Sequence, residues 1–282
     1  MALKIIDIKN LIVDFDIYNS DNVVVSKKRV LDDISLTINK GEFVCVLGKN
    51  GCGKSTFAKC LNALITPTFG AINVSGLDTK DENNIIDIRQ KVGMTFQNPD
   101  NQIVASIVEE DIAFGLENLG IKSDEMRKRI DFATECLGIQ SLRKSMTSKL
   151  SGGQKQKVAI AGILAMKPEI IVLDEPTSMV DKAGRVDILE TVKRLNKEEN
   201  ITIILISHYL EEVKYADRVL LINKGKVTLD DIPDKALLND KLFLDAGLEL
   251  PYIPKMATEL KNMGKKLNGN EISVNELCHY LK

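Results

Sequence analysis

The sequence predicts an α/β protein with a mainly parallel β-sheet core, a β-rich N-terminal part and a small helical domain at the C-terminus. Two observations predict the core. Short apolar runs that suit buried strands, such as EFVCVL, EIIVLD and ITIILIS, alternate with stretches long enough for helices. A glycine-rich turn also follows the first of these runs and precedes a helical pattern. Continuous apolar strands that alternate with helices are typical of a parallel sheet covered on both faces.

Composition narrows the class of protein. The chain has 282 residues, of which 44% are hydrophobic and 28% are charged, and its formal net charge is −2. These values are ordinary for a soluble globular protein and argue against one that mainly coats nucleic acid. The longest apolar runs are much shorter than the ~18 residues expected of a membrane span. The five cysteines form no CxxC pair, which favours reduced thiols in a cytosol.

The first half of the chain begins with strands. β-branched residues favour strands at 3–17 and 30–38, and the polar stretch between them favours a hairpin or loop. Residues 42–48 suit a short buried strand, and residues 54–64 suit a helix. Another strand-like run ends at Phe96, where Pro99 fixes a polar turn.

The second half alternates helices and strands. Helices are expected at 123–138, 152–166 and 184–200, and buried strands at 169–175 and 201–207. A hairpin is expected to turn at Lys224–Gly225. The last fifty residues contain only short helical patterns, which indicate a small appended domain.

The strongest motif follows the first buried strand. Residues 48–55 read GKNGCGKS and fit G-x-x-x-x-G-K-[ST] between a strand and a helix. Glycines let backbone N–H groups converge on a phosphate at the helix N-terminus, a lysine bridges the β- and γ-phosphates, and a hydroxyl can bind Mg²⁺. We therefore expect nucleotide binding by Gly48, Lys49, Asn50, Gly51, Cys52, Gly53, Lys54, Ser55 and Thr56. Ser55 supplies the hydroxyl for the metal.

Three further polar residues close buried strands. Asp174 ends the run IIVLD at the sheet edge where α/β proteins present ligands, and it can hold Mg²⁺ through a water. Glu175 is placed to polarise an attacking water. Alone, such an acid pair is more often a solvated strand end, but beside a phosphate loop it favours catalysis. His208 closes ITIILISH at the same edge, where it could reach a γ-phosphate.

The segment LSGGQKQ, residues 150–156, is a polar, glycine-paired start of a helix. Ser151, Gly152 and Gly153 would form an anion site at that helix N-terminus. The chain already has one phosphate loop, so a second anion site makes sense if it completes the site of another subunit.

These motifs together resemble a known family. GKNGCGKST, Gln97, LSGGQKQ, IIVLDEP, SMVD and LISH appear in the order and spacing of ATP-binding cassette (ABC) ATPases, over residues ~4 to ~240. The segments FQNPDNQ, VEEDIAFGLENLG and LFLDAGLELPYIPKMATELK are similar to the ATPase subunits of energy-coupling factor (ECF) transporters, which import vitamins and metal ions. LSGGQKQKVAIAGILAM most resembles the first of the two ATPases of the shared-module systems.

The resemblance implies a role for each matching residue. Glu175 would be the catalytic base and His208 the γ-phosphate switch. Gln97 would be the coupling glutamine and a magnesium ligand, and Asp181 would contact the partner in the dimer. Two chains would sandwich two ATP molecules, each site using the opposite chain's signature residues, Ser151, Gly152, Gly153 and Gln154.

The resemblance also implies a domain plan and partners. The nucleotide-binding domain would span 1–240, with a helical subdomain at about 98–165, and 241–282 would form a helical dimerisation-type domain. ATP and Mg²⁺ would be the cofactors. The partners would be a second ABC ATPase, identical or related, a transmembrane coupling subunit and a membrane substrate-binding subunit, with no nucleic acid. The protein would be peripheral, at the cytoplasmic face of the cell membrane.

Three positions depart from the family pattern. Lys182 stands where such subunits commonly have proline. The polar insertion between Tyr18 and Val30 leaves two candidates for the aromatic residue that stacks on adenine, Tyr18 first and Phe15 second. Cys52 replaces a small polar residue of the loop and would make the site sensitive to thiol reagents.

The stretch after Gln97 is expected to transmit nucleotide state. By resemblance, the helix behind the glutamine contacts the coupling helices of the transmembrane subunit. Its acids Glu109, Glu110 and Asp111 would suit a basic partner, or else merely solvate an exposed helix face.

Features of the sequence also disfavour several other functions. A DNA-repair ABC ATPase would carry a long coiled coil between the glutamine and the signature, but Gln97 and Ser151 are only 54 positions apart (151 − 97). Ribosome-acting types usually carry two cassettes. The ATPase of an importer with a soluble binding protein is the nearest alternative, while LSGGQ and the acid pair disfavour a P-loop kinase or GTPase. The transported substrate cannot be inferred, because a separate membrane subunit would select it.

Overall fold

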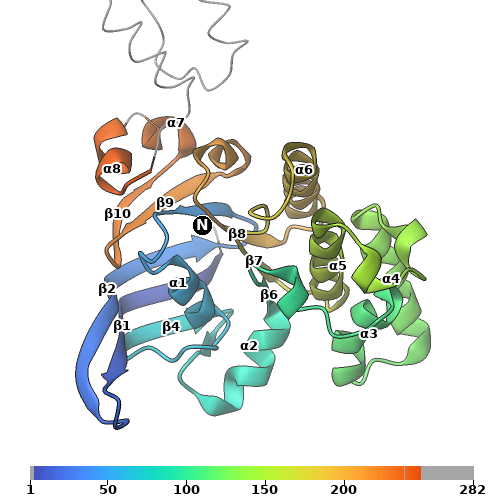
Figure 1. Cartoon of the computed structure of the whole chain (residues 1–282), viewed down its shortest axis with the longest axis horizontal. Helices are drawn as coiled ribbons and strands as arrows, with labels where there is room; N and C mark the ends of the chain where they lie inside the picture. Colours follow the sequence, from blue (N-terminus) through green and yellow to red (C-terminus); the bar gives the residue numbers. More distant parts are fainter. Residues whose placement is uncertain (1–2, 238, 249–282) are drawn as a thin grey trace, which may run out of the picture.

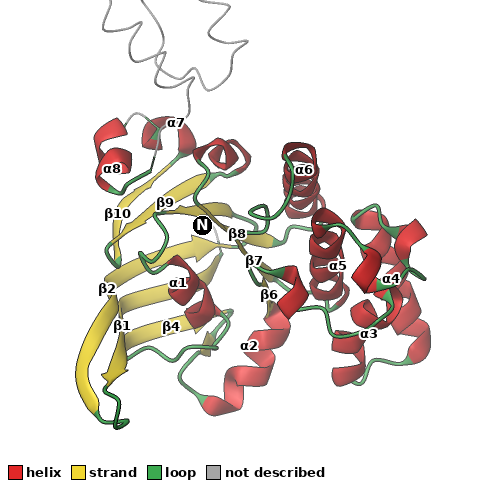
Figure 2. Cartoon of the chain, in the orientation of Figure 1, coloured by secondary structure: helices red, strands yellow, loops and turns green. Residues whose placement is uncertain are grey.

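The structure, a computed structural model, describes residues 3–237 and 239–248. It contains two β-sheets, with helices packed beside them (Figures 1 and 2). The expected α/β fold with a mainly parallel core sheet is confirmed.

The N-terminal sheet is antiparallel, in the order β2-β1-β4-β5. Its strands are β1 (Lys4–Tyr18), β2 (Val24–Asn39), β4 (Phe69–Val74) and β5 (Leu77–Asp78). Apolar residues of the first part of β1 are buried, and the strand is exposed beyond Asp14, where it pairs only with β2. The long β1–β2 hairpin therefore projects from the sheet, as Figure 1 shows in blue.

The core sheet has six strands in the order β10-β9-β3-β8-β7-β6, and only β10 is antiparallel to its neighbour. Its strands are β3 (Phe43–Leu47), β6 (Val92–Thr95), β7 (Ile170–Asp174), β8 (Thr202–Ser207), β9 (Arg218–Asn223) and β10 (Lys226–Asp231). Central strands bury both faces. Cys45 of β3 joins one apolar cluster, and its neighbours Val44 and Val46 join the other.

Helices cover both faces of the core sheet. They are α1 (Lys54–Leu61), α2 (Ile85–Lys91), α3 (Val108–Asn118), α4 (Ser123–Cys136), α5 (Gly152–Ala165), α6 (Lys182–Glu198), α7 (Pro233–Ala236) and α8 (Asp240–Asp245). α1 packs with the N-terminal sheet in one cluster, whereas α3 to α8 contribute to the other. α3, α4 and α5 form a separate helical layer (Figure 2), which falls within the expected helical range.

The core continues past residue 240. Phe243 of α8 is fully buried, and Ala246 and Leu248 are also buried in the cluster on the α5–α6 face. Residues 240–248 therefore pack as part of the first domain. The helical pieces expected further on, within 249–282, lie outside the described residues.

In the part of the chain that the structure covers, every helix is too short or too polar to cross a bilayer.

Candidate functional site

The glycine-rich loop joins β3 to α1 and has room only for glycine at key positions. At Gly48, a Cβ would lie 2.4 Å from the carbonyl oxygen of Ile222. At Gly53, φ is +114°, and a Cβ would lie 2.9 Å from the carbonyl oxygen of Val30. This backbone thus turns tightly beside two strands and delivers its N–H groups to the start of α1.

Lys54 is the first residue of α1 and is only 4% exposed. Its Nζ donates to the carbonyl oxygens of Gly48 at 2.7 Å and Lys49 at 3.1 Å. The same Nζ lies 3.9 Å from Oε1 of Glu175. The loop therefore wraps around a buried ammonium group that faces a carboxylate.

Strand alternation directs Asp174 toward α1. Ile171 and Leu173 face the α5 side of β7, and Ile170 and Val172 face the α1 side, so Asp174 follows on the α1 side. The Oγ of Ser55 donates to its Oδ1 at 3.0 Å. Burial raises the pKa of Asp174, and the Ser55 hydrogen bond opposes that shift. A hydroxyl and a carboxylate are thus paired, as expected for two magnesium ligands.

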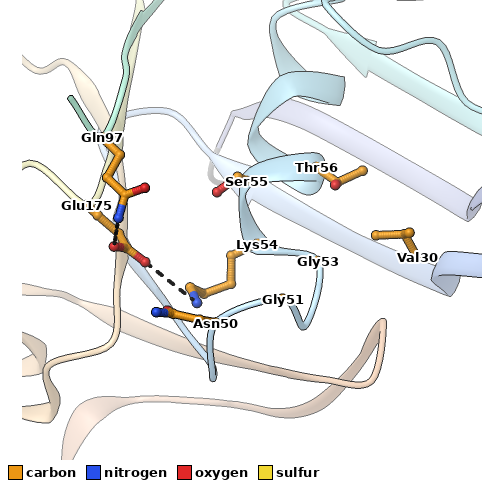
Figure 3. Close-up of a pocket in the computed structure, with 9 residues that line it drawn as sticks. All are labelled: Val30, Asn50, Gly51, Gly53, Lys54, Ser55, Thr56, Gln97 and Glu175. Carbon is orange, nitrogen blue, oxygen red and sulfur yellow. Dashed lines mark hydrogen bonds and ion pairs between the residues drawn. The ribbon is translucent and has the colours of Figure 1, made fainter. Parts of the chain in front are cut away.

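Three predicted residues, Lys54, Gln97 and His208, lie around the carboxylate of Glu175. The backbone φ of Glu175 is +50°. Nε2 of Gln97 donates to its Oε2 at 2.7 Å, and Nδ1 of His208 lies 3.6 Å from the same oxygen. Figure 3 shows the Gln97 amide nitrogen directed at Glu175 and its oxygen on the side of Ser55. The carboxyl ends of β6, β7 and β8 therefore bring together side chains from three separate motifs.

Of these groups, Lys54, Ser55, Gln97 and Glu175 open onto a cavity of about 400 Å³, whereas Asp174 and His208 do not line it. Its lining residues are Val30, Asn50, Gly51, Gly53, Lys54, Ser55, Thr56, Gln97 and Glu175 (Figure 3). Its size is that of a small-molecule site. Val30 was not expected here, because no motif marks it; it enters the lining because β2 passes close to Gly53 of the loop.

The signature residues lie in a different place. Ser151, Gly152, Gly153, Gln154 and Asp181 share a depression of about 520 Å³, and none of them lines the Lys54 cavity. Ser151 caps α5: its Oγ accepts from the Gln154 N–H at 3.3 Å, and the Ser151 N–H donates to Oε1 of Gln154 at 2.9 Å. The phosphate loop and the signature segment of one chain therefore line separate hollows.

Asp181 and Lys182 stand at the start of α6. Asp181 is exposed, and its Oδ1 accepts from the Gly184 N–H at 3.4 Å, which caps the helix. Lys182 takes the first helical position without changing this cap. The turn before Lys182 is thus held by Asp181 itself.

Comparison with known proteins agrees with the motifs. The ABC transporter family model matches residues 31–178. Over 281 residues, the chain is 47% identical to the energy-coupling factor transporter ATP-binding protein EcfA1 of Clostridium novyi, covering 100% of this chain and 99% of that protein.

This chain belongs to the ABC transporter ATPases. Within the family it belongs with the ATP-binding proteins of energy-coupling factor transporters, so the expected family is confirmed.

Two solved structures show the same architecture as this ABC ATPase. One is cbiO1 from Clostridium perfringens, part of the ABC transporter complex cbiONQ, with a TM-score of 0.76 and 32% identity over 92% of this chain and 99% of that chain. The other is the ATP-binding cassette MJ0796, a dimer in a post-hydrolysis state bound to ADP and Pi. Its TM-score is 0.70 and its identity 28%, over 81% of this chain and 98% of that chain.

The structure does not bring Tyr18 to the cavity of this ABC ATPase. Tyr18 pairs with Val24, six positions from Val30, or about 20 Å along the strand. Phe15 pairs with Lys28, two positions from Val30, or about 7 Å. Neither ring lines the cavity, but Phe15 lies nearer to it along the hairpin than Tyr18 does, so Phe15 becomes the better candidate for adenine stacking.

The acids of α3 do not share one role. Oδ1 of Asp111 accepts from the N–H groups of Val104 at 2.7 Å and Ala105 at 3.0 Å. Glu109 lies 3.5 Å from Arg143. Glu110 is exposed, and no cation of the described residues pairs with it. The expectation that Asp111 faces a partner is corrected: it fixes the loop that precedes its own helix.

Cys52 is half-buried in the loop, and its Sγ occupies the space where a Cβ on Gly48 would lie. Burial raises the pKa of its thiol, with Lys54 opposing the shift. A raised thiol pKa lowers the thiolate fraction at neutral pH, which weakens the expected sensitivity to thiol reagents.

Proposed function

We propose that this chain binds and hydrolyses ATP to power an energy-coupling factor importer of vitamins or metal ions. The observation that carries the proposal is the convergence of Lys54, Gln97 and His208 on Glu175 beside the glycine-rich loop. The names of the relatives support the transporter assignment.

The chain's own groups suit phosphoryl transfer to water. Backbone N–H groups of residues 48–55 and the Lys54 ammonium hold the β- and γ-phosphates. Glu175 orients the attacking water and accepts its proton. His208 donates to the γ-phosphate as charge develops on it.

Ser55, Asp174 and Gln97 are the proposed magnesium-binding residues, with Asp174 acting through a water. Their hydroxyl, carboxylate and amide oxygens are hard donors that fit Mg²⁺. Among residues 3–237 and 239–248, no cluster of three or more His, Cys, Asp or Glu could hold a metal, so phosphates and waters must supply the other ligands. Bound Mg²⁺ would neutralise charge on the phosphates.

The separation of Ser151 from Lys54 supports a shared site. We infer that each ATP is closed in by the signature residues of a second ABC ATPase, identical or related, with Asp181 at the dimer contact. The dimeric cassette MJ0796 supports this arrangement. ATP capture would then also close the dimer.

The membrane partners follow from the same reasoning. We infer a transmembrane coupling subunit that contacts the layer of α3 to α5, and a membrane subunit that selects substrate. The chain itself would act as a peripheral protein at the cytoplasmic face.

The proposal is tested by Glu175→Gln and Lys54→Ala in the full chain purified with its membrane partners. Glu175→Gln is expected to keep ATP affinity, to reduce turnover by about 10²-fold or more, and to trap a closed ATPase pair, because the amide cannot accept the proton. Lys54→Ala is expected to weaken ATP binding itself, because the buried cation is lost.

Nucleotide binding, phosphate release and size-exclusion chromatography measure these three effects. Glu190→Gln on α6, an exposed acid outside the cavity, is the matched control and is expected to behave like the wild type. Wild-type turnover in Glu175→Gln would remove that residue from its role.

A further inference from the structure

A buried glutamate outside the described cavity connects two catalytic segments. Glu212 is 1% exposed and belongs to the 3₁₀ segment η5 (Leu210–Tyr215) that follows His208. The Oγ1 of Thr177, which is also 1% exposed, donates to Oε1 of Glu212 at 2.6 Å. This hydrogen bond spans 35 positions of the sequence and is inaccessible to solvent.

The two ends of this bond are close in sequence to the reacting groups. Thr177 follows Glu175 by two residues, and Glu212 follows His208 by four. Their bond therefore links the turn that presents Glu175 to the segment that presents His208, beside the point where Nδ1 of His208 lies 3.6 Å from Oε2 of Glu175.

The turn after β7 needs external support. Glu175 has a left-handed φ of +50°, which is costly for a residue with a Cβ. Its own N–H donates to the carbonyl oxygen of Ile206, and Ser178 Oγ donates to its carbonyl oxygen at 3.0 Å. In addition to Ser178, the side chain of Thr177 stabilises this turn, because its hydroxyl donates a hydrogen bond to Glu212.

A structural role alone does not account for a carboxyl group here. Burial raises the pKa of Glu212, while the hydrogen bond from Thr177 and the nearby Ser207, Arg185 and His208 oppose the shift. A buried carboxyl group is costly, and an apolar residue would fill the same space at less cost. What Glu212 adds is a directional bond to one particular turn.

We propose that Glu212 and Thr177 are positioning residues for ATP hydrolysis: their buried hydrogen bond sets the place of Glu175 relative to His208. Neither residue lines the nucleotide cavity. The bond thus governs the geometry of the water-activating carboxylate without contributing to nucleotide affinity. This inference rests on the hydrolytic function proposed above.

A second contact reinforces the same link. The guanidinium carbon of Arg185, on α6, lies 3.8 Å from the ring centroid of Tyr209, the neighbour of His208. Arg185 lies in the first turn of α6, which begins directly after the turn 175–181. The turn and the His208 segment are thus joined by one hydrogen bond and one cation–π contact.

The test uses Thr177→Val, which keeps the side-chain shape and removes the hydroxyl, and Thr177→Ser, which restores it. Both are measured in the full chain purified with its membrane partners. Thr177→Val is expected to lower kcat roughly tenfold to a hundredfold with KM for ATP unchanged, because a misplaced catalytic group slows chemistry without weakening binding. Thr177→Ser is expected to recover most of kcat.

Glu212→Leu and Glu211→Leu form a matched pair. They are neighbouring, identical changes, but Glu211 is exposed and Glu212 is buried. Leucine cannot accept the Thr177 hydrogen bond, so Glu212→Leu is expected to lower kcat at constant KM, and Glu211→Leu to leave both unchanged. The double variant Thr177→Val/Glu212→Leu is expected to lose no more kcat than Thr177→Val alone, because both remove one bond.

Three results would overturn the proposal: kcat of Thr177→Val within twofold of the wild type, no recovery in Thr177→Ser, or a loss of ATP affinity that parallels the loss of kcat. Failure of the wild-type complex to hydrolyse ATP would instead refute the proposed function. The two failures are therefore distinguishable.

Discussion

Glu175 illustrates how individual residues in this protein serve the site at a local cost. Its backbone has φ +50°, its carboxylate accepts from Gln97, and it faces both Lys54 and His208. Left-handed backbone at a residue with a Cβ persists only where surrounding contacts hold it. The strain lies where the proposed water-activating group must be aimed.

Adenine recognition gives a prediction at the same scale. Phe15→Ala is expected to weaken ATP binding by about tenfold, because stacking on one aromatic ring contributes about 1–3 kcal/mol. Tyr18→Ala, near the hairpin tip, is expected to change affinity less than twofold. Titration with a fluorescent ATP analogue measures both, and a larger loss in Tyr18→Ala would contradict the strand register argument.

At the scale of elements, α3 shows that acidic residues in one helical turn can do different work. Asp111 fixes the preceding loop, Glu109 faces Arg143, and Glu110 remains exposed. Only Glu110 is therefore available to a basic partner.

Glu110→Lys is expected to reduce co-purification of the membrane partner severalfold while ATP affinity stays unchanged, because reversed charge repels a basic contact. Glu190→Lys, the reversal of an exposed acid on α6 and outside the layer of α3 to α5, is the control. Asp111→Lys is unsuitable, since it would release the 104–105 loop. Unchanged co-purification of Glu110→Lys would show that this acid only solvates its helix.

Helix α8 gives a prediction about stability. Phe243→Ala is expected to lower the free energy of unfolding by about 3–5 kcal/mol, because it leaves a cavity in the core. Leu244→Ala, where the side chain is 56% exposed, is expected to lower it by less than about 1 kcal/mol. Urea denaturation compares the two, and equal losses would contradict the assignment of α8 to the core.

At the scale of the whole molecule, the phosphate loop and the signature residues lie in two separate depressions. Ser151→Asp keeps the helix cap, because aspartate is also a good N-cap, but it places a negative charge where a partner's phosphate would bind.

We therefore expect Ser151→Asp to leave ATP affinity of the isolated chain within twofold of the wild type. In the assembled complex, turnover is expected to fall about 10²-fold. Ser151→Thr, which keeps a neutral cap, is the control. If Ser151→Asp weakens ATP binding by the isolated chain as much as Lys54→Ala does, the signature acts within its own subunit.

The sequence alone determined the family, the order of the motifs along the chain and the residues of the phosphate loop. These depend on short-range requirements: glycines at a tight turn, apolar runs for buried strands, and polar residues at strand ends. Asp174, Glu175, Gln97 and His208 could be named because each ends or follows such a run, and Lys54 because it belongs to the glycine-rich motif.

Only the tertiary structure decided which hairpin aromatic lies nearer the cavity, which acid of α3 is exposed and unpaired among the described residues, and whether α8 packs into the core. Each of these depends on strand register or on contacts between distant segments, as in the pairing of Phe15 with Lys28 or the burial of Phe243. The bond between Thr177 and Glu212 belongs to the same class. The spacing of Thr177 and Glu212 in the sequence does not predict their hydrogen bond, because only the fold brings the two residues together.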